Sequence, residues 1–589
     1  MEFRWEIKSK ADPITVQSLS SEINVNPTLA NLLVNRGVDD FQQAKEYFRP
    51  DLDKIHPPFL MKDMDIAVDR LVQAVNQNEK ILIYGDYDVD GTTSVALFYG
   101  YLHEFYPHVD FYIPDRYQEG YGISEKGVRY AAENDFKLIV SLDCGIKALE
   151  NVALAKSLGV DFIICDHHTP GEKLPDALAV LDPKRKDCNY PYKELSGCGV
   201  GFKLMQAFVE KTGKNASHLF GYLDLVAVSI AADIVPITGE NRILAYYGLE
   251  RLNNNPRPGL MALILAGKGT RSLDELLSNK HLLQREMLQL KTDKDINISD
   301  IVFRIGPRIN ASGRLEHAKA SVELLISKDI QDALQRAELV EDVNSARKNF
   351  DENITKEAIQ MIEDMEAIRP YKSTVLFKED WHKGVIGIVA SRCIEQFYRP
   401  TIILTESNNK ATGSARSVFD FDIYSAISEC SDLLEQFGGH KYAAGLTLAV
   451  DKVEAFQEKF EEVVSQRISD IHTKPVLEVD DELELDQINY KFYNILQQMT
   501  PFGPGNPEPV FCANQVYARN IRVLKDKHLK FEIVQDGQQT FPVCIAFGFA
   551  TYYEMLNSKM RFNIAFEIRE NTFRNTSTLQ LYVKDIKFD

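Results

Sequence analysis

The sequence predicts an α/β protein in three parts: a parallel-sheet domain, a long helix leading to a smaller α/β domain, and a C-terminal β-barrel. In the first half of the chain, short and nearly continuous apolar segments alternate with helical patterns, which is typical of a parallel sheet with helices on both faces. A long charged segment with Ala and Leu at helical spacing follows at 329–365. The tail from residue 476 alternates apolar and polar residues, as half-buried strands do.

Three apolar segments are the expected strands of the parallel sheet, at 80–84, 137–142 and 160–165. Helical patterns at 92–105 and 148–158 lie between them. In open parallel sheets, ligands bind where the carboxyl ends of the strands lie. A functional site is therefore expected in the loops that follow these strands.

Acidic and imidazole side chains occupy those loops. In chain order they are Asp86, Asp88, Asp90, Asp143, Asp166, His167, His168 and Asp233. Because parallel strands end at one edge of their sheet, we expect these side chains to converge. So many like charges would repel one another unless a cation neutralised them. The pattern predicts a divalent-metal site suited to phosphate chemistry.

Each acidic segment also has a structural alternative. The loop at 86–91 resembles the start of an EF-hand calcium loop, but Leu97 stands at loop position twelve, where a Glu is required. Asp143 could be a helix N-cap, and a His pair after a strand could be structural. Four such segments at strand ends favour a metal site over four separate structural roles.

Four segments resemble the motifs of the DHH phosphoesterases, at 84–93, 142–145, 166–168 and 231–236. Downstream segments resemble the RecJ branch of that superfamily, at 305–314, 381–387, 413–417, 438–440 and 501–507. The resemblance covers nearly the whole chain from about residue 60. It implies a single-stranded-DNA-specific 5′→3′ exonuclease with a DHH domain, a long helix, a DHHA1 domain and an OB-type barrel.

The resemblance also implies a two-ion site. It implies that Asp88 binds one ion, that Asp90, His167 and Asp233 bind the other, that Asp143 bridges the two, and that Asp86 is an additional carboxylate. Imidazole ligation suits Mn²⁺ better than Mg²⁺, so two Mn²⁺ ions are expected, with Mg²⁺ as the alternative. Two such ions can activate a water and neutralise the leaving oxygen.

Other residues are expected to contact the substrate. His168 is expected to contact the scissile phosphate or a ligand. Either Arg308 or Arg314 is expected to stabilise the charged transition state. The resemblance implies that Arg116, Ser414 and Arg416 hold the 5′ end and that Gly438, Gly439 and His440 bind nucleic acid. Isolated Gly-Ser-x-Arg and Gly-Gly segments are also common in simple turns.

Patterns along the chain suggest five regions. They are an N-terminal extension at 1–60, the metal-binding domain at 61–250, a helical connector at 251–370, the DHHA1 domain at 371–470 and the barrel at 471–589. The polar stretch at 291–300 is expected to be a loop. The barrel strands are expected at 510–523, 528–535, 540–547, 561–569 and 578–588. Tyr517, Phe531, Phe541 and Phe547 are candidates for base stacking, with the barrel core as the alternative position for each.

Composition restricts the class of protein. The net charge of −19 argues against tight, indiscriminate binding of nucleic acid, so basic contacts are expected to be local, as at 184–186 and 525–530. The eight cysteines include no Cys-x-x-Cys pair, which disfavours a disulfide framework or a zinc knuckle. The N-terminus has no apolar signal region and no apolar run has membrane-spanning length, so a cytoplasmic protein with no membrane contact is expected.

Two alternatives compete with the exonuclease. A small-nucleotide phosphodiesterase or a manganese pyrophosphatase would share the metal cluster, but on a shorter chain without the barrel. A non-catalytic replication or repair scaffold would lack ligands, whereas every expected ligand is present here. Single-stranded DNA is the expected partner, single-strand-binding protein and a helicase follow only by family association, and a monomer is expected.

Overall fold

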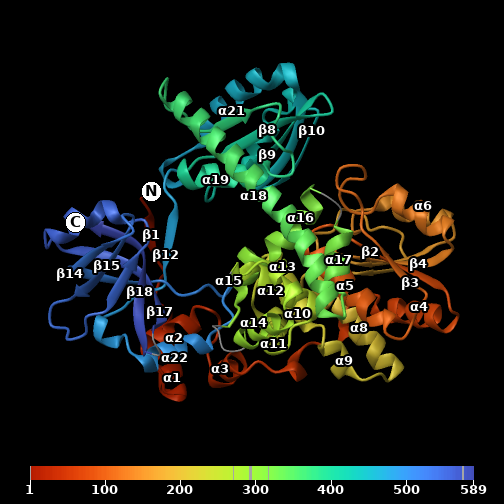
Figure 1. The fold of residues 1–589 in the computed structure, drawn as a ribbon, viewed down its shortest axis with the longest axis horizontal. Coiled ribbons are helices and arrows are strands. Elements are labelled where there is room, and N and C mark those ends of the chain that lie inside the picture. The colour runs from red at the N-terminus through yellow and green to blue at the C-terminus, as the bar shows by residue number, and fades with distance from the viewer. Residues whose placement is uncertain (1, 270, 291–294, 316–317, 574–575, 589) are drawn as a thin grey trace. The chain divides into compact units, whose positions relative to one another are not determined.

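A five-stranded parallel sheet organises the part of the chain that carries the acidic motifs. The computed structural model describes residues 2–269, 271–290, 295–315, 318–573 and 576–588 (Figure 1). The sheet order is β3-β2-β4-β5-β6, with every neighbouring pair parallel. Its strands are β2 (Lys80–Gly85), β3 (Val109–Tyr112), β4 (Phe136–Leu142), β5 (Asp161–Cys165) and β6 (Ala179–Leu181). The predicted strands are confirmed as β2, β4 and β5.

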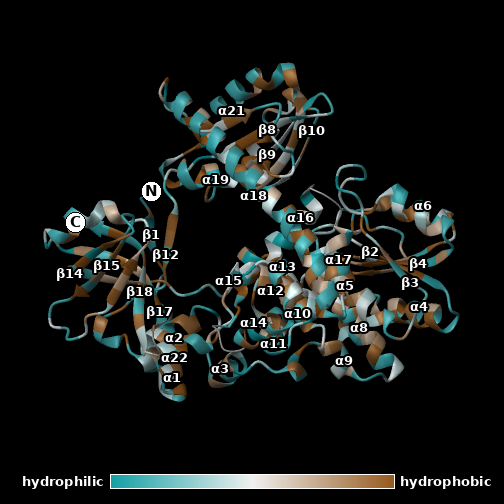
Figure 2. Cartoon of the chain, viewed as in Figure 1, coloured by the Kyte–Doolittle hydropathy of each residue, from teal (hydrophilic) through white to brown (hydrophobic). Residues whose placement is uncertain are grey.

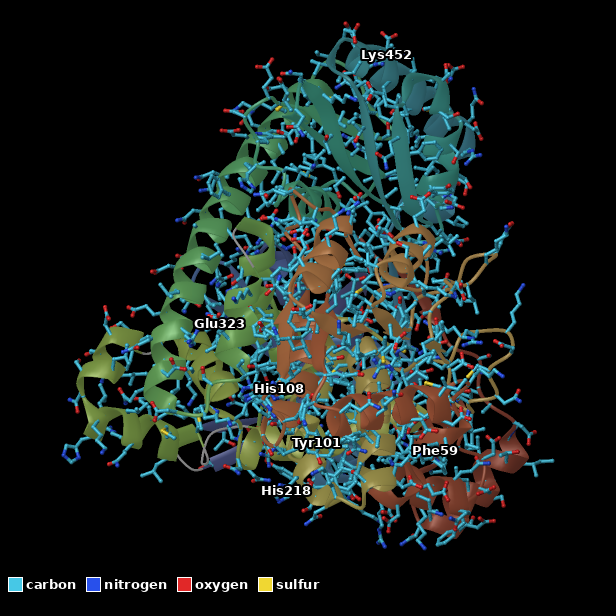
Figure 3. The ribbon with its side chains drawn as sticks, turned by 90° about the vertical axis from the view of Figure 1, so that its right-hand side faces the viewer. Phe59, Tyr101, His108, His218, Glu323 and Lys452 are labelled. Carbon is cyan, nitrogen blue, oxygen red and sulfur yellow. The ribbon has the colours of Figure 1, made fainter. Side chains whose placement is uncertain are left out.

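Burial explains why these strands contain almost only apolar residues. Residues 81–85 of β2 and 138–142 of β4 are all buried, and Figure 2 shows both strands in the colour of hydrophobic residues. Helices cover the sheet, and α5 (Val89–His103) and α8 (Gly197–Thr212) bury most of their residues. Tyr101 of α5, labelled in Figure 3, is itself buried. The strands β3 and β6 were not predicted because four and three residues are too few to show a pattern.

The chain divides into two units that do not follow its order. The second unit comprises 46–346 and 500–507, and the first comprises 1–45, 347–499 and 508–589. Helices in the second unit are α4 (Met64–Asn76), α5 (Val89–His103), α6 (Glu125–Glu133), α7 (Leu149–Ser157), α8 (Gly197–Thr212), α9 (Ala216–Phe220), α10 (Leu223–Ala232), α11 (Gly239–Asn254), α12 (Pro258–Lys268), α13 (Leu273–Ser278), α14 (Lys280–Leu290), α15 (Ile298–Asp300), α16 (Gly306–Leu315) and α17 (Lys319–Leu325).

The stretch at 291–300 is only partly a loop. Residues 291–294 lie outside the described residues, whereas α15 occupies Ile298–Asp300 and a π-helix follows at Ile301–Ile305. Asn297 caps α15, because its side chain accepts the Asp300 N–H at 3.0 Å while the Asp300 side chain accepts the Asn297 N–H at 3.1 Å. The loop prediction is therefore wrong for 298–300, where a reciprocal cap starts a helix inside a polar sequence.

The long helix α18 (Ile330–Glu366) matches the predicted 329–365. Its first half contributes Ala333, Leu334 and Ala337 to the core of the second unit. Its second half contributes Ile354 and Ala358 to a core cluster of the first unit. The helix therefore presents an apolar stripe to a different core at each end. Its other side chains do not pack into either core, which explains why many of them are charged.

The region at 371–466 is a mixed sheet of order β10-β11-β9-β8-β7, in which only β7 and β8 pair in parallel. Its elements are β7 (Thr374–Phe377), α19 (Ile386–Gln396), β8 (Thr401–Ser407), β9 (Lys410–Arg416), α20 (Ile423–Ser428), β10 (Gln436–His440), β11 (Ala443–Ala449) and α21 (Val453–Arg467). Helix α21 buries Phe456 and Phe460 against the core of this sheet.

The tail forms a closed barrel, as predicted. Its strands follow the order β14-β15-β16-β18-β17, and β17 pairs with β14 to close it. The elements are β12 (Val476–Val479), β13 (Asp481–Glu482), α22 (Tyr490–Gln498), β14 (Phe511–Leu524), β15 (His528–Val534), β16 (Val543–Ala546), α23 (Tyr553–Asn557), β17 (Phe562–Phe573) and β18 (Thr576–Phe588). The strand expected at 540–547 starts only at Val543, after Pro542, which has no N–H to donate.

The aromatic candidates of the barrel divide between core and surface. Phe531 is buried in the core, Tyr517 is half-buried, and Phe541 and Phe547 are exposed. Arg519 lies over the Phe541 ring, 3.9 Å from its centre. Of the four candidates, only the two exposed rings could stack with bases without unpacking the barrel.

The N-terminal extension divides between the units, with residues 1–45 in the first and 46–60 in the second, and it contributes a strand that the sequence did not indicate. It contains β1 (Arg4–Ile7), α1 (Pro13–Ile23), α2 (Pro27–Val34) and α3 (Phe41–Phe48). Strand β1 pairs in parallel with β12. In the part of the chain that the structure describes, no helix is both long and apolar enough to cross a membrane.

Candidate metal centre

A tight loop after β2 gathers the first three aspartates. Asp86 follows the strand directly, and Asp88 caps α5 by accepting the Gly91 N–H at 2.9 Å. A Cβ on Gly91 would lie 2.7 Å from the Asp86 nitrogen, so only glycine allows the helix to start this close to the strand end. The cap also explains why α5 begins at Val89, three residues before the predicted start at residue 92.

Asp90 is fixed by the N-terminus of another helix. Its carboxylate accepts the N–H groups of Gly197 at 2.7 Å and Cys198 at 2.8 Å, both in the first turn of α8. The Ser229 hydroxyl donates a third bond at 2.7 Å from α10. A helix N-terminus favours a carboxylate, so these donors hold Asp90 in one orientation.

Asp143 depends on a glycine that the sequence reasoning did not single out. Its backbone is in the left-handed region, with φ 61°, directly after β4. A Cβ on Gly197 would lie 2.5 Å from the Asp143 Cβ and 2.6 Å from its Oδ1. Gly197 thus makes room for one aspartate while its N–H binds another, and the Ser-Gly-x-Gly run at 196–199 is the signal that could have revealed it.

His167 lies where three of the carboxylates meet. Its Nε2 is 3.2 Å from Asp143 Oδ1, 3.5 Å from Asp233 Oδ2 and 3.7 Å from Asp90 Oδ2. Both His167 ring nitrogens, both Asp86 carboxylate oxygens and Asp143 Oδ1 are buried, and the structure gives them no hydrogen-bond partner. Buried polar atoms without partners are rare in folded proteins and indicate a missing ligand.

The carboxylates destabilise one another's charged forms. Burial, followed by the charge of Asp88, raises the pKa of Asp86 to about 8. Burial and the charge of Asp90 likewise raise the pKa of Asp233 to about 8. The pKa of Asp143 is raised well above its ordinary value by burial and by its acidic neighbours, and burial lowers the pKa of His167. A divalent cation would lower the pKa values of these carboxyls and favour the neutral form of His167. Carboxylates bind metals when they are deprotonated, and imidazole binds them when it is neutral.

Two overlapping sets of side chains offer ligand atoms within 4.8 Å of one another among the described residues. One set is Asp90, His167 and Asp233, and the other is Asp143, His167 and His168. The first set matches the group expected on one ion. His168 therefore belongs to a set that could hold an ion, whereas Asp86 and Asp88, on the loop after β2, belong to neither set. The donors, oxygen and imidazole nitrogen, fit Mn²⁺ or Mg²⁺.

Asp166 orients His168, a role that the sequence did not assign. Its Oδ1 accepts the backbone N–H groups of His167 and His168, and it lies 2.8 Å from His168 Nδ1. This hydrogen bond raises the pKa of His168 to about 9 despite the opposing effect of burial. Burial raises the pKa of Asp166, but the bonds and charge of His168 and the Ile146 N–H outweigh it and lower the pKa. The other ring nitrogen of His168, Nε2, lies 3.3 Å from the Tyr121 hydroxyl.

The predicted arginines differ in their surroundings. Arg116 lies over the Tyr87 ring, 5.1 Å from its centre, and its charge acts on Asp86. The positive charge of Arg314 also acts on Tyr87. Arg308 instead is buried, pairs with Glu341 at 2.5 Å and donates to the carbonyl of Ala266. The Arg308 guanidinium is therefore already engaged in an ion pair, whereas the charge of Arg314 acts beside the loop after β2.

The remaining predicted residues form a group of their own in the first unit. Arg416 donates to the Ser414 hydroxyl at 2.9 Å, and burial lowers its pKa. A Cβ on Gly387 would lie 2.8 Å from the Arg416 guanidinium, so the 381–387 segment packs directly on this pair. Gly438, Gly439 and His440 lie on β10, a largely exposed edge strand paired with β11.

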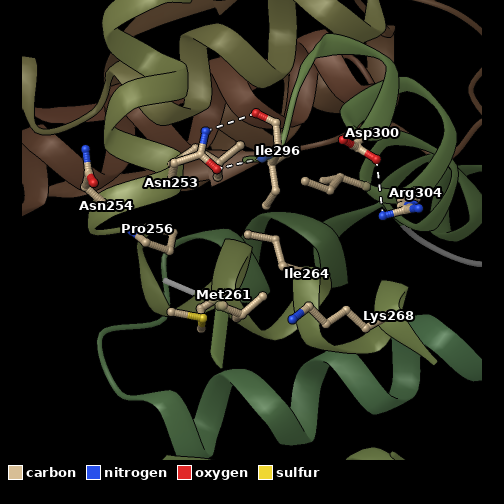
Figure 4. Close-up of a pocket in the computed structure, with 12 residues that line it drawn as sticks. Asn253, Asn254, Pro256, Met261, Ile264, Lys268, Ile296, Asp300 and Arg304 are labelled. Carbon is tan, nitrogen blue, oxygen red and sulfur yellow. Dashed lines mark hydrogen bonds and ion pairs between the residues drawn. The ribbon is translucent and has the colours of Figure 1, made fainter. Parts of the chain in front are cut away.

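A separate pocket in the second unit contains none of these residues. Figure 4 shows its mostly apolar lining, which includes Met261, Ile264 and Ile296. Its polar groups are largely paired: Arg304 lies 3.2 Å from Asp300, and Asn253 bonds the backbone of Ile296. This pocket is poorly suited to metal or phosphate chemistry, so the carboxylate cluster is the candidate active site.

Comparisons with known proteins agree on one family. The profile of the DHH family, N-terminal domain, matches residues 80–230, the DHHA1 domain matches 371–466, and the RecJ OB domain matches 479–585. The single-stranded-DNA-specific exonuclease RecJ of Bacillus subtilis (strain 168) is 37% identical over 590 residues, covering 99% of this chain and 70% of that protein. Its namesake from Escherichia coli (strain K12) is 31% identical over 578 residues, covering 95% of this chain and 96% of that protein.

Solved structures show the same likeness. The crystal structure of RecJ in complex with Mn²⁺ from Thermus thermophilus superposes with a TM-score of 0.81 at 26% identity, covering 100% of this chain and 80% of that chain. A crystal structure of exonuclease RecJ bound to manganese gives a TM-score of 0.56 at 31% identity, covering 70% of this chain and 96% of that chain.

Proposed function

Because the chain belongs to the RecJ family of single-stranded-DNA-specific exonucleases, we propose that it degrades single-stranded DNA from the 5′ end with two divalent ions at the carboxylate cluster. The observation that carries the proposal is the completeness of the cluster. Every ligand expected from the motifs is present, and buried oxygens and nitrogens that lack partners belong to three of those ligands.

Asp90, His167 and Asp233 would hold one ion, Asp88 the other, and Asp143 would lie between them, with Asp86 as a further carboxylate. When bound, two such ions supply a nucleophilic water and neutralise charge on the phosphate and the leaving oxygen. We propose Mn²⁺ as the more activating ion, because imidazole ligation suits it better than Mg²⁺.

The protein's own residues hold the reacting phosphate. His168, whose pKa is raised to about 9, is protonated at neutral pH and can donate from Nε2 to a phosphate oxygen. Arg314, rather than the buried Arg308, is the arginine proposed to meet developing negative charge. Arg116, Ser414 and Arg416 are proposed to bind the 5′ end, because guanidinium and hydroxyl donors recognise phosphate.

The acidic net charge constrains how the substrate is held. With a charge of −19, the surface as a whole repels DNA, so binding must depend on local cations and on base stacking. The exposed Phe541 beside Arg519, the exposed Phe547, and the Gly438–His440 edge supply such contacts. We further propose a cytoplasmic monomer that releases 5′-mononucleotides during DNA repair and recombination, with single-strand-binding protein and a helicase as partners.

The test is hydrolysis of single-stranded DNA labelled at either end, with Mn²⁺ or Mg²⁺, beside a duplex, an RNA strand, pyrophosphate and a dinucleotide. Mononucleotides should appear first from the 5′ end of the DNA strand, fastest with Mn²⁺, and the Asp143→Asn variant should release none. Asp53→Asn, at an exposed aspartate in the same unit, is the matched control. Hydrolysis of pyrophosphate or dinucleotide alone would contradict the exonuclease.

A further inference from the structure

The segment 500–507 leaves the first unit and packs within the second, against the chain that follows Asp233. Its sequence is Thr-Pro-Phe-Gly-Pro-Gly-Asn-Pro and includes the 501–507 segment that resembles the RecJ branch. Gly503 and Asn506 close a tight turn through two mutual backbone hydrogen bonds of 2.9 Å, which places Pro504 and Gly505 at its tip. No role in the reaction described so far requires this turn.

The tip of the turn contacts the three residues 236–238. The Ile237 N–H donates to the Pro504 carbonyl at 2.7 Å. A Cβ on Gly505 would lie 2.9 Å from Thr238 Cγ2, and a Cβ on Gly503 would lie 2.5 Å from Ile237 Cδ1. Glycine at both positions therefore lets the turn pack closely against the side chains of Ile237 and Thr238.

Buried side chains fix the turn itself. Arg242 is buried and donates to the carbonyls of Thr500 at 2.8 Å and Tyr47 at 3.0 Å, while its guanidinium stacks 4.0 Å from the centre of the Tyr47 ring. The Asn506 side chain donates to the Pro501 carbonyl and accepts from the Tyr47 hydroxyl, both at 2.8 Å. These contacts hold the turn in one conformation, so the turn can fix the position of residues 236–238.

The supported residues stand immediately after a candidate metal ligand. Asp233 is the C-cap of α10, and Ile234 follows with φ 60°, a left-handed conformation that β-branched residues rarely adopt. Ile234 is exposed, so its own side chain does not hold this conformation. The chain is held instead at Pro236, whose carbonyl accepts from Tyr192 and Asn241, and at Ile237.

We propose that segment 500–507 is a positioning element for the metal centre, which keeps the strained chain after Asp233 in place and so aims its carboxylate at His167 and Asp90. This inference rests on the proposed function, because it assumes that Asp233 binds a cation. Residues that orient metal ligands typically contribute about ten-fold to hundred-fold to metal affinity. The element lies in the sequence just before β14 and supports the candidate metal site without supplying a ligand.

The test measures Mn²⁺ binding directly, by calorimetry on the full chain. Gly505→Ala places a methyl group against Thr238 at an exposed position and should weaken Mn²⁺ binding about ten-fold. The double variant Gly505→Ala/Thr238→Ser removes that methyl contact while keeping the hydroxyl that bonds Tyr192, and should recover most of the affinity. Gly213→Ala is the control, because Gly213 has a similar φ of 65° and no atom within 4 Å of its added Cβ.

Hydrogen exchange at the Ile237 amide provides a second readout. It should accelerate in Gly505→Ala and in Gly503→Val, and stay as in the wild type in Gly213→Ala, with the melting temperature of Gly505→Ala falling no more than that of Gly213→Ala. If both turn variants bind Mn²⁺ as the wild type does, the segment is only structural and the inference is overturned. If the wild type itself binds no Mn²⁺, the proposed function fails first and the inference fails with it.

Discussion

Replacing Asp86 by Asn should stabilise the metal-free protein. The Asp86 carboxyl has both oxygens buried without partners, and its pKa is raised to about 8 from an ordinary 3.8. A raised carboxyl pKa contributes stability that is present below about pH 4 and is lost as pH rises through about 8. At pH 7 that loss is at most about 4 kcal/mol, from ~1.4 kcal/mol for each pH unit above the ordinary pKa.

Asparagine carries no charge and avoids this loss, but its amide also lacks partners in the same site, which costs about 1–3 kcal/mol. The expected net gain is therefore about 1–3 kcal/mol, which in a unit of this size raises the melting temperature by about 1–2 °C per kcal/mol. The assay is thermal unfolding of EDTA-treated wild type and variant at about pH 5.5 and about pH 8.5.

The gain should be larger at the higher pH, where more of the wild-type carboxyl is forced to ionise. Excess Mn²⁺ should then stabilise the wild type more than Asp86→Asn, because a bound ligand stabilises by mass action. Asp53→Asn should change neither the melting temperature of the metal-free protein nor the stabilisation by Mn²⁺. A metal-free variant that melts below the wild type at the higher pH would refute the idea that unbalanced carboxylate charge dominates this site.

Four further predictions follow from the same geometry. Mn²⁺ affinity should fall as pH drops below about 8, by up to about ten-fold per pH unit for each proton displaced, because two carboxyls of the cluster have pKa values of about 8; calorimetry across pH measures it. Gly197→Ala should lower Mn²⁺ affinity by about ten-fold or more, because its Cβ would meet an aspartate of the cluster at 2.5 Å; an unchanged isotherm would exclude this. Asp166→Asn should lower the pKa of His168 from about 9 toward 6.5, as an NMR titration would show. Phe547→Ala should weaken single-stranded DNA binding by about 1–3 kcal/mol without changing stability, whereas Phe531→Ala should cost about 3–5 kcal/mol of stability; the reverse pattern would contradict their placement.

The fold class could be predicted because burial leaves a direct trace in the sequence. Strands β2, β4 and β5 are covered on both faces, so their residues are almost all apolar, and the acidic residues mark where each strand ends. The 37-residue helix α18 was equally clear, because its apolar stripe repeats over many turns. The two shortest strands of the parallel sheet left no such pattern.

Contacts between distant segments could not be predicted. The pairing of β1 with β12 joins residues 4–7 to residues 476–479, and no local pattern encodes it. The ion pair of Arg308 with Glu341 likewise joins two different helices. The contacts that support the candidate metal ligands, Gly197 beside Asp143 and the 500–507 turn beside the chain after Asp233, are likewise visible only in three dimensions.

Anomalous scattering from crystals of the full chain soaked in Mn²⁺ is the most direct test of the metal centre. It should reveal two manganese peaks at the cluster, one of them ligated by Asp90, His167 and Asp233. A well-ordered crystal whose manganese lies elsewhere, or that holds none at these side chains, would contradict the assignment of this cluster as the catalytic metal site.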